Sequence, residues 1–257
     1  MNEIYTIALN TYRESVRSKI LYSVLMFAFL FIFIASIFGS VTVGDQVKVL
    51  KDFGLFTISL FGVVYIIING STLLNKELTK KTIFNILSKP VSRSSFVVGK
   101  FIGMFFTVVL IQLIMGILFA LFVYLFENKF DYNLFIGFFC IFLQMFIVCA
   151  LVVFFSTIVV TPMLSGAFTF GIYLTGRSTI YIETFITQIF QNNTNPLLQK
   201  TIMFLIPQLD KIDVNNEIVY GMEISSVALA YGLIYSITYV SLLLIFSCYF
   251  FKNRQFN

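Results

Sequence analysis

A stretch of 45 residues without a charged side chain, from Tyr132 to Gly176, constrains this sequence more than any other feature. As a single helix it would be about 68 Å long at 1.5 Å per residue, more than twice the roughly 30 Å hydrocarbon core of a bilayer. The stretch must therefore fold back. Its one proline is in Thr161-Pro162, and because proline breaks a helix we predict a tight turn there. The alternative is a proline kink in one long tilted helix, which would remove one span.

The overall composition places these apolar runs in a membrane. Hydrophobic residues make up 59% of the chain and charged residues 11%, whereas soluble domains average about 45–50% and about 25%. Only helices and closed barrels satisfy their backbone hydrogen bonds in lipid, and these runs are continuous rather than alternating. We therefore expect an all-α integral membrane protein, one domain over 1–257, with six transmembrane helices at 20–38, 53–74, 101–126, 132–160, 163–183 and 224–251.

The distribution of charge predicts which ends of the spans face the cytosol. If both termini are cytosolic, the inner pieces carry eleven Lys and Arg against three acids, and the outer pieces carry six against nine; the inner pieces are 1–19, 75–100, 161–162 and 252–257. Cytosolic loops show this excess of basic residues, so the net charge of +5 reflects orientation and requires no nucleic-acid partner. In the longest outer piece, 184–223, we expect a re-entrant or interfacial helix over 197–209, with a further full span as the alternative.

The polar residues inside the predicted spans are few and uncharged. The sequence has no histidine, and its three cysteines show no metal-ligand spacing, so no metal site is predicted. Ion-coupled transport needs ionisable groups at mid-membrane, and the span interiors contain no Asp, Glu, Lys or His. Three amides remain there, Asn69, Gln112 and Gln144. We interpret them as interhelical hydrogen-bonding groups, with a place on a substrate pathway as the alternative.

No segment of the sequence predicts a nucleotide-binding or catalytic site. The stretch "GIYLTGRS" at 171–178 imitates a phosphate-binding loop, but such a loop joins a strand to a helix in a soluble domain. Its glycines are better explained by close helix approach. The acids Asp210, Asp213 and Glu217 are expected to be solvated loop residues, and a membrane enzyme built on them is a remote alternative. If this protein uses ATP, another chain must bind it.

The segment 75–100 holds six of the seventeen Lys and Arg residues between two nearly uncharged spans. From Lys76 to Ser88 the pattern predicts an amphipathic helix, one face of which carries Thr79, Ile83, Ile86 and Leu87. Lys89-Pro90 should end this helix, and Ser92 or Ser94 should cap the next one, where Gly99 and Gly103 have the spacing of a close helix contact. The segment is therefore expected to be a cytosolic elbow. Its role could be an orientation signal, an acidic-lipid patch or a docking helix for a partner protein.

Four stretches of the sequence resemble the ABC-2 type transporter permeases. "TYRESVRSKILYSVLMF" at 11–27 is similar to the family's amphipathic N-terminal helix, with Arg13, Glu14 and Arg17 forming its R-E-x-x-R core. "KELTKKTIFNILSKPVSRSSFVVGKFIG" at 76–103 resembles the family's cytosolic elbow, although Lys81 stands where the family usually has glycine. "IPQLDKIDVNNEIVYG" at 206–221 and "YFFKNRQF" at 249–256 resemble the outer segment before the last span and the basic C-terminus.

The resemblance implies a fold and a function. The fold would be the ABCG-like, type V exporter domain, with a cytosolic helix at 1–19 and both termini inside a multi-pass cell inner membrane. Such permeases pair with two separate ATP-binding subunits, which hold ATP and Mg. The elbow corresponds to the coupling helix that docks on them, here Glu77, Thr82, Ile83, Ile86, Leu87, Pro90 and Arg93.

The same resemblance implies a dimer of permease chains, most simply a homodimer, which moves a substrate outward and can work with a periplasmic or extracellular accessory protein. This chain would carry no catalytic residue and no cofactor of its own. A polytopic membrane anchor or sensor subunit is the alternative function.

Overall fold

Every regular element in the part of the chain that the structure describes is a helix. The computed structural model describes residues 2–41, 46–79, 92–129, 131–189, 206–222 and 224–253. The helices are α1 (Asn2–Val16), α2 (Lys19–Val41), α3 (Gln46–Thr79), α5 (Arg93–Glu127), α6 (Asn133–Ile158), α7 (Pro162–Arg177), α8 (Thr179–Ile189), η1 (Asp210–Ile212), α10 (Asn215–Tyr220) and α11 (Ser226–Asn253). The all-α prediction is thus confirmed for these ranges.

Five of these helices are long and apolar enough to cross a membrane, namely α2, α3, α5, α6 and α11. They contain nearly all of the predicted spans 20–38, 53–74, 101–126, 132–160 and 224–251. The remaining predicted span, 163–183, is instead divided at Ser178 between α7 and α8. Helix α7 has 16 residues, and its length of about 24 Å falls short of a bilayer core. The expected count of six spanning helices is therefore not confirmed.

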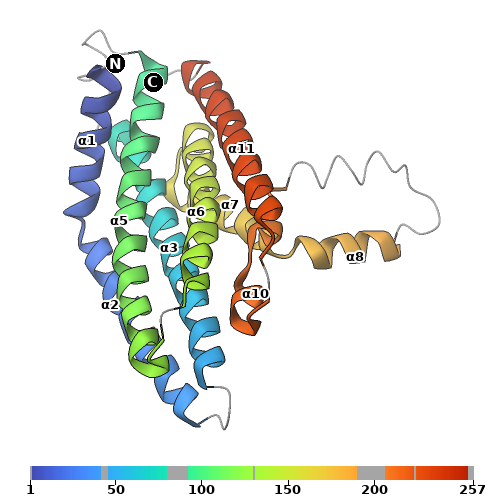
Figure 1. Cartoon of the computed structure of the whole chain (residues 1–257). Helices are drawn as coiled ribbons and strands as arrows, with labels where there is room; N and C mark the ends of the chain where they lie inside the picture. Colours follow the sequence, from blue (N-terminus) through green and yellow to red (C-terminus); the bar gives the residue numbers. More distant parts are fainter. Residues whose placement is uncertain are drawn as a thin grey trace.

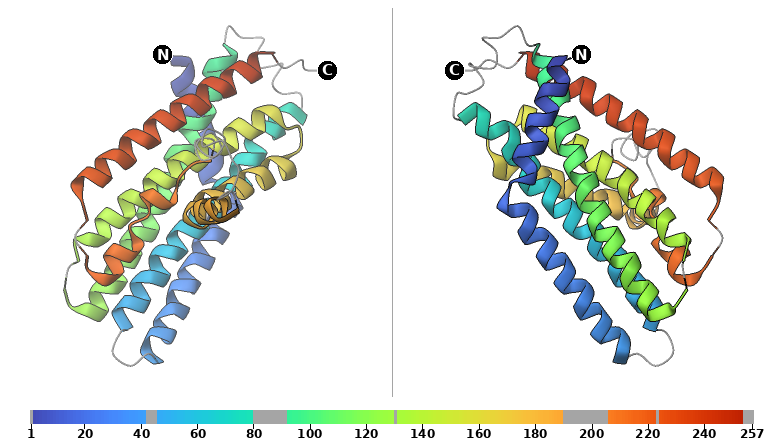
Figure 2. Two further views of the ribbon diagram at one scale, coloured as in Figure 1. Left: turned by 90° about the vertical axis from the view of Figure 1, so that its right-hand side faces the viewer. Right: turned by 60° about the vertical axis from the view of Figure 1, so that its left-hand side comes forward.

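The chain reverses direction at Thr161-Pro162. Helix α6 ends at Ile158 and α7 begins at Pro162, a position where proline suits the first helical turn. The hydroxyl oxygens of Ser156 and Ser165 lie 2.9 Å apart, whereas nine residues of continuous helix would separate them by about 13.5 Å. Figure 2 shows the chain doubling back at this point. The predicted turn is correct, and the kinked single helix is excluded.

Helices α3 and α6 form the centre of the bundle (Figure 1). Helix α3 packs against α2, α5, α6 and α7, and α6 packs against α3 and α11. The first turn of α5 lies beside the last turn of α11, where the rings of Phe96 and Phe251 stack with centroids 5.7 Å apart. This end, which also holds the start of α1, is called the terminal end. The opposite end holds the start of α3 and the α5–α6 connection.

The contact between α1 and α5 depends on two glycines. A Cβ at Gly103 would lie 2.4 Å from the carbonyl oxygen of Ala8, and a Cβ at Gly99 would lie 2.8 Å from the side chain of Ile7. Both distances are shorter than real Cβ contacts, so only glycine lets the two helices approach this closely. The close helix contact predicted from the spacing of Gly99 and Gly103 is confirmed, and its partner is α1.

Candidate functional site

The predicted docking segment connects two helices at the terminal end. Glu77 lies in the last turn of α3, and Arg93 is the first residue of α5. The other predicted docking residues, Thr82, Ile83, Ile86, Leu87 and Pro90, lie outside the described residues. Because α3 is central and α5 carries α1, a partner that moved this segment would act directly on both the core and the N-terminal helix.

The first turn of α5 is fixed by its own cap and by the last helix. Ser92 has extended backbone geometry, and its hydroxyl accepts a hydrogen bond of 3.0 Å from the backbone N–H of Ser95. Ser92 is therefore the predicted N-cap. Arg93 Nη1 donates to the carbonyl oxygen of Lys252 at 2.9 Å, which places a cation at the carboxyl end of α11, where the helix dipole favours it. Arg93 thus binds this chain's own last helix.

Helix α1 is amphipathic, as predicted, and is joined to α3 as well as α5. Its exposed face carries Arg13 and Glu14, with the exposed Arg17 just beyond its end, while Ser15 is buried. Asn69 Nδ2 donates to Ser15 Oγ at 3.0 Å and to the hydroxyl oxygen of Tyr65 at 3.1 Å. Asn69 is therefore an interhelical hydrogen-bonding residue.

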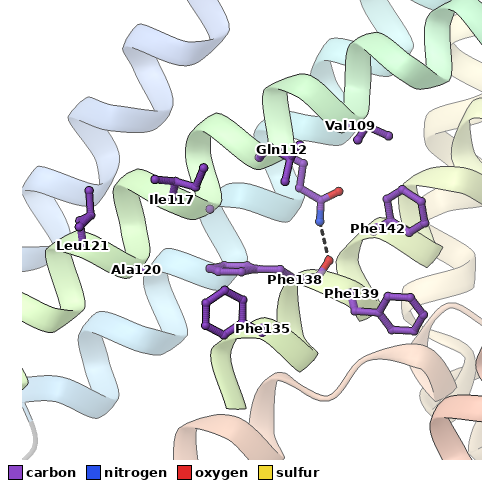
Figure 3. A pocket seen from close by; sticks show the side chains of 11 residues that line it. Val109, Gln112, Ile117, Ala120, Leu121, Phe135, Phe138, Phe139 and Phe142 are labelled. Carbon is purple, nitrogen blue, oxygen red and sulfur yellow. Dashed lines mark hydrogen bonds between the residues drawn. The ribbon is translucent and has the colours of Figure 1, made fainter. Parts of the chain in front are cut away.

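Gln112 forms an interhelical hydrogen bond between α5 and α6, at the edge of an apolar groove. Its Nε2 donates to the carbonyl oxygen of Phe138 at 2.6 Å (Figure 3). The groove has a volume of about 540 Å³ and, apart from Gln112, is lined by apolar residues, among them Phe135, Phe138, Phe139 and Phe142. Gln144 Nε2 donates to the carbonyl oxygen of Leu209 at 3.4 Å. Each of the three amides therefore donates a hydrogen bond to another element, as the interhelical interpretation predicts.

Residues 206–222, called the strap, place three apolar side chains between the helices, while Lys211 and Tyr220 are exposed. Leu209, Ile212 and Ile218 are each less than 5% exposed. The backbone N–H of Leu209 donates to the carbonyl oxygen of Gly176 at 3.1 Å. Irregular backbone among membrane helices is stable only where protein groups satisfy it, and α7 and Gln144 of α6 do so here. Of the segment predicted to be re-entrant or interfacial, 197–205 lies outside the described residues, and the following residues are buried.

Arg177, at the end of α7, holds the strap by an ion pair. Its Nη2 pairs with Asp213 Oδ2, and its Nη1 donates to Ser59 Oγ of α3 at 3.1 Å. Burial raises the pKa of the Asp213 carboxyl, which lies outside the five candidate spans, and the neighbouring Arg177 opposes this shift. The prediction that Asp213 is solvated is wrong, since its carboxylate pairs with Arg177 and is largely buried. The two residues are 36 positions apart, so no local spacing in the sequence indicates the pair.

The glycine preceding that arginine permits the approach. A Cβ at Gly176 would lie 2.5 Å from the carbonyl oxygen of Pro207, whereas a Cβ at Gly171 would meet nothing within 4 Å. The interpretation of the glycines in "GIYLTGRS" as close-approach residues is correct for Gly176, which approaches the strap, whereas among the described residues nothing lies close to Gly171. The strap, the end of α7 and α3 therefore form one contact.

A second ionic cluster lies at the opposite end of the bundle. Lys51 Nζ is 2.7 Å from Asp131 Oδ2 and 3.1 Å from Glu127 Oε2, and Lys51 is only 7% exposed. These residues border a polar cavity of about 560 Å³ that also touches α10. Helix α3 begins at Gln46, seven residues before the predicted span 53–74, so the ammonium group of Lys51 is carried into the bundle and needs both carboxylates.

The strap carries three acids, Asp210, Asp213 and Glu217. Among the described residues, no group of three His, Cys, Asp or Glu side chains is placed to hold a metal ion. Asp213 pairs with Arg177. The described polar groups are therefore suited to holding helices and the strap in position.

Comparison with known families gives one match. A family model described as "ABC-2 family transporter protein" matches residues 5–256, nearly the whole chain. No curated protein matches the sequence. The match includes α1, the segment between α3 and α5, the strap and α11.

Proposed function

The chain belongs to the ABC-2 family of transporter proteins, and from this premise we propose that it moves a substrate outward, driven by ATP hydrolysis on a separate subunit. Family membership makes it the membrane-spanning permease subunit of an ABC transporter and a multi-pass membrane protein. The direction of transport and the coupling to ATP are the proposed part.

The observation that supports this proposal best is the set of helix contacts at the terminal end. The start of α5, which follows residues 80–91, meets α1 and the last turn of α11 there. Gly99 and Gly103 hold α1 against α5 by backbone contact, and such packing is difficult to deform. A partner ATPase that pushed on the segment 77–93 would therefore move several helices at once.

The charges support a cytosolic position for the terminal end. Among the described residues, Lys76 lies near the end of α3, Arg93 begins α5 and Lys252 lies near the end of α11, and the positive-inside rule assigns an end with such basic residues to the cytosol. We accordingly place the protein in the cell inner membrane with both termini inside. The strap and the Lys51 cluster then lie toward the outer side.

The proposed assembly contains two permease chains, as a homodimer, and two ATP-binding subunits that hold ATP and Mg. Glu77, Thr82, Ile83, Ile86, Leu87 and Pro90 are proposed to form the docking surface. Arg93 acts differently, since its guanidinium contacts α11. An accessory protein on the outer side is compatible with the polar cavity beside Lys51, and no nucleic acid takes part.

The test is copurification with the ATP-binding subunit. Leu87→Glu should abolish copurification because it puts a charge on the proposed docking face, whereas Arg93→Glu should leave part of the binding intact and reduce coupled ATP turnover. Lys129→Glu, an exposed residue in the α5–α6 connection, is the control and should change neither. If Leu87→Glu retains full binding and coupled turnover, the docking proposal fails.

A further inference from the structure

Helix α11 is embedded less deeply than the other candidate spans. Only 11% of the residues in its most apolar window are buried, compared with 67% for α6. Its buried residues form a narrow stripe of mostly small side chains, Gly232, Ser236, Val240, Ser247 and Phe251. The hydroxyls of Ser236 and Ser247 donate to carbonyl oxygens of α11 itself, each at 2.7 Å. A smooth stripe of this kind allows one helix to slide along another.

At the terminal end α11 is fastened to the first turn of α5. Arg93 Nη1 donates to the carbonyl oxygen of Lys252 at 2.9 Å. One turn further along α5, the ring of Phe96 stacks on that of Phe251 at an interplanar angle of 20°. Phe251 is fully buried, so this is a packed contact as well as a polar one. Any displacement of the first turn of α5 therefore reaches the end of α11.

Toward its other end α11 is fastened to the strap. The backbone N–H of Gln208 donates to the hydroxyl oxygen of Tyr235 at 2.9 Å. A Cβ at Gly232 would lie 3.8 Å from Ile212 of the strap and 3.8 Å from Leu143 of α6. The two fastenings, at Tyr235 and Lys252, are 17 residues apart, about 26 Å along a helix. Helix α11 thus connects the first turn of α5 to the strap.

The strap is the element with a reason to move. Two buried oxygens of the strap, Asp210 Oδ2 and Asn215 Oδ1, accept no hydrogen bond from the described residues. The same is true of Gln144 Oε1 of α6, whose amide contacts the strap. Buried acceptors without donors raise the free energy of the packed arrangement. An arrangement that gave them water or other donors could then compete with the observed one, which is the condition for a two-state element.

We propose that α11 transmits the movement of the first turn of α5 to the strap by sliding along α6, so that ATP-driven displacement at the terminal end opens the strap. This inference rests on the proposed function, because the driving movement comes from the ATP-binding subunit. Phe251 and Tyr235 are positioning residues in it: neither needs to touch the substrate or the ATPase.

The test measures strap movement and ATPase coupling separately in the assembled complex. Spin labels on Lys211→Cys in the strap and Lys129→Cys in the α5–α6 connection, both exposed, report the distance between these two segments in a variant whose native cysteines are replaced. One labelled permease chain is assembled with one unlabelled chain, so that only the distance within a protomer is recorded. The distance is measured by double electron–electron resonance, first without nucleotide and then with ATP and vanadate. Tyr235→Phe removes the acceptor of the Gln208 N–H, and Phe251→Ala removes the stack on Phe96. Tyr231→Phe and Phe246→Ala, both on exposed positions of α11, are the matched controls.

We expect ATP and vanadate to change the label distance in the parent complex. Tyr235→Phe and Phe251→Ala should reduce that change by more than half while the ATP-binding subunit still copurifies and hydrolyses ATP, and the two controls should retain it. A parent complex whose label distance does not change, or variants that keep the full change, would overturn the inference and leave the proposed function intact. Failure of the parent chain to bind the ATPase would instead reject the proposed function and this inference with it.

Discussion

At the terminal end α1 meets α5 through glycine backbone and small side chains, whereas the strap meets the bundle through an ion pair and single hydrogen bonds. The first contact has Gly99 and Gly103 against Ala8 and Ile7. The second has Arg177 against Asp213, and Gln144 and Tyr235 against the strap backbone. Both involve a segment lying against membrane helices, and they differ in what holds the segment in place.

This difference indicates which contact can change during a transport cycle. Apolar packing in a membrane is lost only by separating surfaces, because lipid offers nothing better than the lost contacts. Polar contacts can exchange partners with water once a segment shifts. The α1–α5 contact therefore suits a unit that moves as one body, and the strap suits a unit that opens. The following variants test that contrast.

The largest effect is expected at the ion pair. Asp213→Leu leaves the guanidinium of Arg177 without its carboxylate, and because both side chains are more than three quarters buried we expect a loss of about 3 kcal/mol in the free energy of unfolding. The double variant Arg177→Met with Asp213→Leu should lose clearly less, since no charge is then stranded. Unfolding in mixed detergent measures both. Additive losses would show that the two side chains do not interact.

The apolar contact is tested by Gly103→Ala. The added methyl would lie 2.4 Å from a backbone oxygen of α1, and overpacking of this kind is expected to cost about 2 kcal/mol. Gly171→Ala is the matched control, because it adds the same methyl to a helix where nothing lies within 4 Å. It should leave stability unchanged or raise it slightly. Equal effects of the two substitutions would mean that helix propensity, and not the α1 contact, explains the result.

Local sequence patterns predicted the parts of the fold that local physics determines. Hydropathy located the five long helices, proline located the turn at Thr161-Pro162, and serine located the cap of α5. The division of the predicted span 163–183 at Ser178 was missed, although Arg177 stands just before it. The contacts of Gly176 and Arg177 with the strap join residues more than 30 positions apart and carry no local signal. The span count and the orientation stay predictions.

For the candidate site, the sequence indicated which residues form hydrogen bonds but not which residues they contact. Asn69, Gln112 and Gln144 were recognised as hydrogen-bonding residues, but their partners come from other elements and could not be named. Arg93 was expected on the docking surface, and only the structure shows its contact with Lys252. The pairs of Lys51 and Arg177 join distant parts of the chain, so they carry no local signal at all.

A smaller effect is expected from Asn69→Leu. The substitution removes the donor to Ser15 and Tyr65, and interhelical hydrogen bonds in membranes contribute about 0.6–1 kcal/mol. Asn10→Leu changes an exposed asparagine of α1 and is the control. If α1 is held mainly by Gly99 and Gly103, Asn69→Leu should lower stability less than Gly103→Ala does. The opposite order would mean that a polar contact dominates at the terminal end also, and the contrast with the strap would be lost.

The smallest and most local effect is expected from Ser92→Ala at the start of α5. Losing the hydroxyl that accepts from the Ser95 N–H should cost about 1 kcal/mol or less, and Ser92→Asp should restore it because a carboxylate also accepts this bond and suits the helix dipole. Hydrogen exchange should show faster exchange in the first turn of α5 and no change at Gly103, which α1 holds by packing. That first turn carries Arg93 and Phe96, the two contacts to α11. A loosened cap should therefore weaken strap movement in the labelled complex while α1 stays bound, which separates the rigid contact from the transmitting one within a single helix.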